Sequence, residues 1–174
     1  MRARIAELIR ADMALYACHL PLDAHPELGN NAVLSKMLGL NAVEPFGDYR
    51  RYQRWFQGQT RCVYKHRRGC QASPAGRSYR PRTLLPFGTK QISSVAVVSG
   101  SADLQSAQAI AEGIDLFVTG EPSHSIYHET LEAGLNFIAA GHYLTEVHGV
   151  KAVAEAVSRE LGLETVFIDV PTGL

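Results

Sequence analysis

Two residues that can ligate a metal ion lie one helical turn apart near the C-terminal end of the chain. His142 follows the apolar run 137–140 and Gly141, and Glu146 comes four residues later. Residues at this spacing share one face of a helix. An imidazole nitrogen and a carboxylate oxygen placed side by side can hold one divalent cation. The carboxylate also offsets the positive end of the helix dipole, which disfavours a cation. A solvated ion pair is the alternative that the spacing alone leaves open.

A second candidate ligand, Asp23, lies in the loop expected over residues 19–26. It follows the apolar run 13–18, which we interpret as a buried strand. Pro21 and Pro26 predict a stiff loop rather than a regular helix, and a stiff loop suits a preorganised ligand. The alternative is a turn in which the Asp23 carboxylate accepts backbone N–H bonds.

A third group of polar side chains follows the apolar run 116–119. Glu121 comes first, and His124 and His128 lie one turn apart on the helix expected next. Glu121, His124 and His128 are therefore candidate catalytic residues, acting as general acids or bases in one crevice. Alternatively, Ser123 caps the helix and both imidazoles lie on a solvated face.

Alternating apolar runs and helical periodicity dominate the chain from residue 92 onward. The predicted strands cover residues 92–98, 116–119, 137–140 and 165–168. The predicted helices cover 2–11, 30 or 31–38, 102–112, 123–133, and 142 or 145–161. This order predicts an α/β fold with a mostly parallel or mixed sheet and helices on both faces. Sites in such sheets lie at the carboxyl ends of the strands, where all three candidate groups fall.

The bulk composition excludes several classes of protein. The chain has 174 residues, 46% of them apolar, which suits one domain or two small lobes with a real core. No apolar run approaches the roughly 18 residues of a membrane span. The zero formal net charge gives no support for a nucleic-acid partner. Three cysteines argue against a disulfide framework, so a reducing cytoplasm is the expected location, with Cys18 as a core residue.

The segment 49–90 departs from this composition. Eleven Lys or Arg and no Asp or Glu occur between Tyr49 and Ala102. We predict an anomalous, irregular segment here, between a remnant of an N-terminal lobe at 1–48 and a C-terminal α/β lobe at 91–174. Three interpretations stay open: an out-of-frame or unconstrained stretch, a basic nucleic-acid arm with interleaved aromatic residues, or a metal knuckle. The knuckle would use the ligands Cys62, His66 and Cys70.

Taken together, these motifs resemble the GTP cyclohydrolase 1 type 2 homologue family. The resemblance lies in the run 19–31 (HLPLDAHPELGNN), in Thr119-Gly120-Glu121, in the Gly141-His142…Thr145-Glu146 box and in the ending 167–169. It covers about residues 1–48 and 91–174, in the family's order. The segment 49–90 has no such likeness, which is what compensating frameshifts would leave.

The resemblance implies a metal centre and an assembly. Members of this family form toroidal homo-hexamers of two-lobed α/β subunits, with two metal ions per subunit. Asp23, His142 and Glu146 match three of the family's ligands. The family's other two ligands are an adjacent His pair, and this sequence has none, so we expect an N-terminal part of the subunit to be absent. One bound ion or none is therefore expected here, with Zn, Mn, Fe and Ni equally compatible.

The function implied by the resemblance is metal-assisted hydrolysis of a purine nucleotide or a related ring. Two alternatives belong to other classes: a metal-binding assembly or regulatory protein without turnover, and an inactive truncated remnant. The family's fold does not by itself decide the reaction.

Overall fold

The computed structural model describes residues 2–49, 52–63 and 82–172. Within these ranges the strands are β1 (Asn41–Tyr49), β2 (Tyr52–Val63), β3 (Thr83–Pro86), β4 (Gln91–Val97), β5 (Leu116–Thr119) and β6 (Asn136–Ala139). The helices are α1 (Arg2–Arg10), α2 (Leu20–Asp23), α3 (Asn30–Met37), the 3-10 helix η1 (Asp103–Gln105), α4 (Ser106–Ala111), α5 (Ile126–Ala133) and α6 (His142–Leu161).

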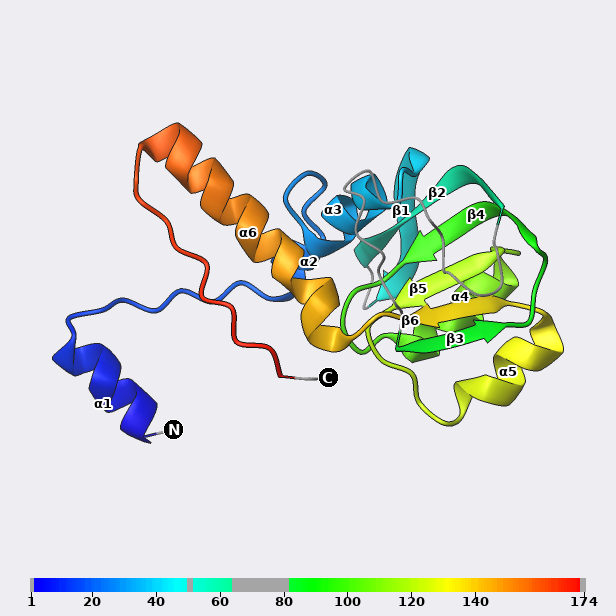
Figure 1. Ribbon diagram of the computed structural model, residues 1–174, viewed down its shortest axis with the longest axis horizontal. Coiled ribbons are helices and arrows are strands. Elements are labelled where there is room, and N and C mark those ends of the chain that lie inside the picture. The colour runs from blue at the N-terminus through cyan, green and yellow to red at the C-terminus, as the bar shows by residue number, and fades with distance from the viewer. Residues whose placement is uncertain (1, 50–51, 64–81, 173–174) are drawn as a thin grey trace.

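The strands form one six-stranded mixed sheet in the order β1-β2-β4-β5-β6-β3. The central strands β4, β5 and β6 are parallel, whereas β1, β2 and β3 pair antiparallel with their neighbours. The predicted α/β class with a mixed sheet is confirmed. The carboxyl ends of β4, β5 and β6 meet at one edge of the sheet, and α6 begins directly after β6 (Figure 1).

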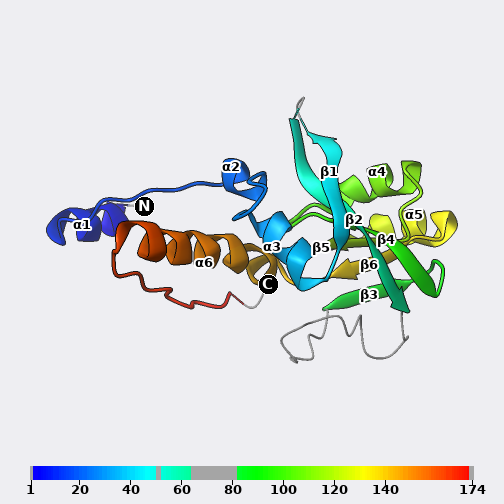
Figure 2. The same cartoon turned by 90° about the horizontal axis from the view of Figure 1, so that it is seen from above.

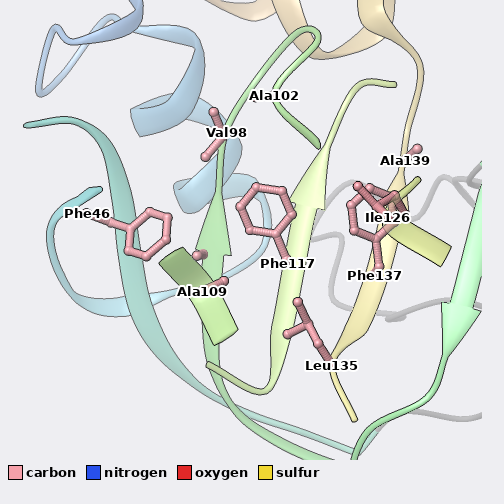
Figure 3. Close-up of a cluster of buried hydrophobic side chains, with 10 residues drawn as sticks. Phe46, Val98, Ala102, Ala109, Phe117, Ile126, Leu135, Phe137 and Ala139 are labelled. Atoms are coloured by element: carbon pink, nitrogen blue, oxygen red, sulfur yellow. The ribbon is translucent and has the colours of Figure 1, made fainter. Parts of the chain in front are cut away.

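Two apolar clusters cover the two faces of the sheet. Alternate side chains of one strand point to opposite faces. Ala96, Phe117 and Phe137 therefore join the cluster that packs against α4 and α5, shown in Figure 3. Val97 and Val118, their neighbours along the chain, join the second cluster, which packs against α3. Each fully buried large side chain contributes about 1.5–3 kcal/mol. Helices on both faces, as predicted, thus hold the strand ends in place.

Both chain ends differ from the prediction. Residues 13–18 and 165–168, predicted as strands, belong to no strand in the described part of the chain. Leu15 is 77% exposed and Ile168 is 78% exposed. Cys18 is only half-buried, so its assignment to the core was wrong. α1 buries none of its residues and lies apart from the sheet (Figures 1 and 2). Both segments have the apolar composition of a strand, but a strand also needs a neighbouring strand with which its backbone can pair.

The basic segment is more regular than predicted. Its described residues contribute β2, which pairs with β1 on one side and β4 on the other, and β3, which pairs with β6. The prediction of an irregular segment over 49–90 was therefore wrong for residues 52–63 and 83–86. Of the predicted knuckle, His66 and Cys70 lie outside the described residues. One sheet thus draws strands from all three segments expected from the sequence.

Among the described residues, no helix combines the length and the apolar character needed to cross a membrane. Even the 20-residue α6 carries charged and polar side chains along its length.

Candidate functional site

His142 and Glu146 lie in the first turns of α6, at the edge where the parallel strands end. The His142 Nε2 atom is 3.3 Å from the Glu146 Oε2 atom, and both side chains are about one-third exposed. The predicted sharing of one helical face is confirmed by this contact. Gly141, at the N-cap of α6, adopts a φ of 106°, which allows the sharp turn from β6 into the helix.

Three glycines bring the strand ends together beneath this turn. The Gly120 N–H donates to the Gly100 carbonyl at 2.9 Å, and the Gly141 N–H donates to the Gly120 carbonyl at 2.8 Å. A Cβ on Gly120 would lie 2.6 Å from the Gly100 oxygen and 2.9 Å from the His142 Cα atom. Thr145 Oγ1 accepts a bond from the Gly100 N–H at 3.0 Å and so ties α6 to the turn after β4. The position of His142 therefore depends on close backbone approach between all three loops.

Asp23 ends the short helix α2 and is only 6% exposed. The prolines were expected to forbid a helix here, but Pro21 falls in the first turn, where its missing N–H would have no helical partner in any case. The Asp23 Oδ1 atom accepts a bond from Asn30 Nδ2 at 2.8 Å and a weaker one from Ser99 Oγ at 3.4 Å. Asn31 Nδ2 donates to the Asp23 carbonyl at 3.2 Å. The carboxylate is thus fixed from both α3 and the loop after β4.

Asp23 approaches the His142–Glu146 pair through the turn at residues 99 and 100. Ser99 touches the Asp23 carboxylate, and a Cβ on the next residue, Gly100, would lie 2.4 Å from Glu146 Oε1 and 3.4 Å from His142 Nε2. Burial raises the pKa of the Glu146 carboxyl, and the nearby Asp23 carboxylate raises it further, while His142 and His19 oppose the shift. The three predicted ligands therefore share one electrostatic neighbourhood.

His19 and Asn30 also belong to this neighbourhood. The sequence placed His19 in the same loop as Asp23, but it gave neither His19 nor Asn30 a role as a ligand. His19 is the N-cap of α2 and acts electrostatically on Glu146. Asn30 is 5% exposed and joins Asp23 to α6, because its Oδ1 accepts from the Gly149 N–H at 2.7 Å. The one signal in the sequence was the position of both residues inside the HLPLDAHPELGNN run.

The donor set fits one divalent cation better than two. One imidazole and two carboxylates are common ligands of Zn, Mn, Fe and Ni. The charged groups that act on the Glu146 carboxyl are His142, Asp23 and His19, so the only basic groups among them are imidazoles, which can also ligate a cation. Within the same residues, however, no three His, Cys, Asp or Glu side chains are already close enough together to hold an ion. The contacts between the candidate ligands are pairwise, and it is the chemistry of the donor set that fits a cation.

The three predicted acid–base residues, Glu121, His124 and His128, make contacts in different places. Glu121 reaches His142, with Oε1 3.1 Å from Nδ1. His124 instead lines a mostly apolar pocket of about 240 Å³ with Thr83, Leu85 and Tyr127. His128 packs edge-on against Tyr127, with ring centroids 5.3 Å apart. Acid–base roles for these three residues stay predictions, but their contacts do not form one shared crevice.

Replacing Asn30 with Ala is expected to lower the free energy of unfolding by about 2 kcal/mol or more, because it leaves the buried Asp23 carboxylate and the Gly149 N–H without this partner. Urea denaturation followed by circular dichroism measures the change. Asn41→Ala is the matched control: its exposed amide makes only a 3.5 Å bond to the Gly39 carbonyl, and a change within about 0.5 kcal/mol is expected. Equal effects of the two substitutions would show that Asn30 has no special role.

This site defines an α/β protein with potential metal ligands gathered at the carboxyl ends of parallel strands. A family model described as Duf34/NIF3 (NGG1p interacting factor 3) matches residues 1–173. The chain belongs to the Duf34/NIF3 family, and the resemblance seen in its motifs is confirmed.

Individual relatives agree with this assignment. The chain is 40% identical over its whole length to a protein of Archaeoglobus fulgidus named GTP cyclohydrolase 1 type 2 homolog, of which it covers 69%. It is 45% identical to the protein of the same name from Halobacterium salinarum, with 98% of this chain and 68% of that protein matched.

Solved structures show the same fold. A structure titled protein ybgI, unknown function, matches with a TM-score of 0.83 and 34% identity, over 98% of this chain and 67% of that one. TTHA1606 from Thermus thermophilus matches with a TM-score of 0.76 and 38% identity, over 99% of this chain and 67% of that one. The chain thus spans about two thirds of the length of these relatives.

Proposed function

We propose that this chain binds one divalent cation through Asp23, His142 and Glu146 and promotes metal-assisted hydrolysis of a purine nucleotide or a related ring compound. One observation carries the proposal: residues 99 and 100 lie between Asp23 on one side and the His142–Glu146 pair on the other. The names of the Archaeoglobus and Halobacterium relatives supply the substrate class. A homo-hexamer in the cytoplasm, as the family resemblance implies, is part of the same proposal.

The protein's own residues prepare this site before any ligand arrives. Asn30 and Ser99 fix the Asp23 carboxylate, and the glycine turns fix the start of α6. Preorganised ligands of this kind lower the entropy lost on binding. A divalent cation, when bound, supplies Lewis-acid activation of an oxygen and of water. Glu121, which is half-buried against His142, can accept or donate a proton beside the site.

Metal content and turnover test the proposal together. After loading with Zn²⁺ or Mn²⁺ and extensive dialysis, we expect no more than one ion per chain by mass spectrometry, because the ligand set is too small for two. We also expect GTP to be consumed only when the metal is present. An ion count close to two per chain would contradict the one-cation site.

Binding without turnover would point to the second candidate, a non-catalytic metal-binding protein. No measurable binding of either metal would rule out both functions.

A further inference from the structure

The Glu121 carboxylate lies beside Nδ1 of the His142 ring, on the opposite edge from Glu146. Glu121 follows β5, and its backbone N–H donates to the Gly100 carbonyl at 3.2 Å. Its side chain is 35% exposed, and its Oε1 atom lies 3.1 Å from His142 Nδ1. On the other side of the ring, Nε2 lies 3.3 Å from Glu146 Oε2. The imidazole therefore lies between two carboxylates that come from different elements, one from the loop after β5 and one from α6.

The chemistry of the two partners limits the arrangement of protons. A neutral imidazole has one N–H donor and one nitrogen lone pair, and an ionised carboxylate only accepts. If Nδ1 carries the hydrogen, the ring donates to Glu121 and Nε2 presents its lone pair toward Glu146. If Nε2 carries it, the ring donates to Glu146 and the Nδ1 lone pair points at Glu121. Either tautomer thus leaves one lone pair facing a carboxylate, and the shorter contact, 3.1 Å at Nδ1 against 3.3 Å at Nε2, favours the first arrangement. Only the first arrangement leaves a nitrogen lone pair on the side where Asp23 and Glu146 gather.

We infer that Glu121 is a positioning residue that holds His142 in the Nδ1–H tautomer, so that Nε2 is free to ligate a cation together with Asp23 and Glu146. This inference rests on the proposed function, and it gives Glu121 a role different from the acid–base role predicted from the sequence. Carboxylates that accept the remote N–H of a metal-ligating imidazole fix the orientation of the ring and raise its basicity. The backbone bond from Glu121 to the Gly100 carbonyl supports such a role, because it holds the loop after β5 within reach of the His142 ring.

Glu121→Gln tests the inference with little risk to folding. A glutamine side chain has nearly the same shape, but its amide can either donate or accept, so it no longer selects one tautomer. In metal-free protein, long-range ¹⁵N–¹H spectra report which nitrogen of His142 is protonated. We expect the Nδ1–H tautomer in the unaltered chain and a shift toward the Nε2–H tautomer in the variant. Isothermal titration with Zn²⁺ should show about 10–100-fold weaker binding by the variant.

Glu132→Gln is the matched control, because it removes the same charge from an exposed position on α5. It should change neither the tautomer nor the Zn²⁺ affinity. The inference is overturned if unaltered His142 is found in the Nε2–H tautomer, or if Glu121→Gln keeps both the tautomer and an affinity within about twofold of the unaltered chain, well below the usual effect. Failure of the unaltered chain to bind Zn²⁺ would sink the proposed function instead, and the spectra of the metal-free protein would still decide the tautomer.

Discussion

Replacing His142 with Ala is expected to weaken Zn²⁺ or Mn²⁺ binding by more than about 100-fold, the upper end of what the loss of a group that merely orients a ligand produces. His142 is the one imidazole in direct contact with Glu146 among the described residues, and Glu146 already shares its surroundings with Asp23. Without the ring, two neighbouring carboxylates remain as the ligands. Isothermal titration gives the affinity, and GTP consumption in the presence of metal should be lost in parallel.

His128→Ala is the control for this result. His128 is an exposed imidazole on α5 whose described contact is the Tyr127 ring. The variant removes the same chemical group from a position outside the proposed ligand set, so its cation affinity should match that of the unaltered chain. If His142→Ala and His128→Ala bind the cation equally well, His142 is not a ligand.

A methyl group added at Gly120 is expected to lower the free energy of unfolding by at least about 3 kcal/mol, at the upper end of the usual range for overpacking. The new Cβ would lie 2.6 Å from the Gly100 carbonyl oxygen, 2.8 Å from Thr145 Oγ1 and 2.9 Å from the His142 Cα atom. Two of these three neighbours are backbone atoms that cannot rotate away. Separation of the loops would also displace α6, so Zn²⁺ affinity should fall in the molecules that still fold. Urea denaturation of Gly120→Ala measures the loss of stability.

Gly113→Ala separates this steric effect from a backbone effect. Gly113 has a φ of 68° and no atom within 4 Å of an added Cβ. Its replacement should therefore lower stability only by the left-handed backbone penalty, about 1–2 kcal/mol, and should leave Zn²⁺ affinity unchanged. A Gly120→Ala protein as stable as Gly113→Ala would contradict the close approach of the three strand ends.

The part of the fold that the sequence predicted is the part governed by local signals. The runs that became β4, β5 and β6 are apolar and end in small or turn-forming residues, and the intervening helices show helical periodicity. Gly134 and Gly162 end α5 and α6 in the left-handed conformation, which glycine adopts readily. The contact between His142 and Glu146 needed only helical spacing. No knowledge of distant segments was required for any of these features.

Strand pairing could not be predicted in this way. The residues of β2 show no clear period of apolar side chains. The segment is nevertheless a strand, because its backbone forms hydrogen bonds with β1 on one side and β4 on the other. Residues 165–168 have the composition of a strand, but the chain there runs back along α6. Lys151 Nζ lies 4.3 Å from the centre of the Phe167 ring, and Tyr143 donates to the Asp169 carboxylate. Apolar alternation shows which side chains favour burial, but not which segment will pair with them.

The candidate ligands could be named from the sequence, but the residues that hold them in place could not. The types of Asp23, His142 and Glu146, together with the family resemblance, singled them out. Their convergence depends on contacts between distant segments, such as Asn30 with Gly149 and Glu121 with His142. The sequence placed Glu121 with His124 because they are neighbours along the chain, whereas the turn after β5 directs Glu121 toward α6. The geometry of the loop after β5 determines the direction of the Glu121 side chain, and the spacing of residues along the sequence does not reveal it.

Anomalous diffraction from crystals soaked in Zn²⁺ tests most directly whether Asp23, His142 and Glu146 share one cation. Data collected at the zinc absorption edge should show a single peak per chain, within about 2.0–2.2 Å of His142 Nε2 and of one oxygen from each carboxylate. A map with no peak between α2 and the start of α6, or with zinc bound only by side chains outside this set, would contradict the proposed metal centre.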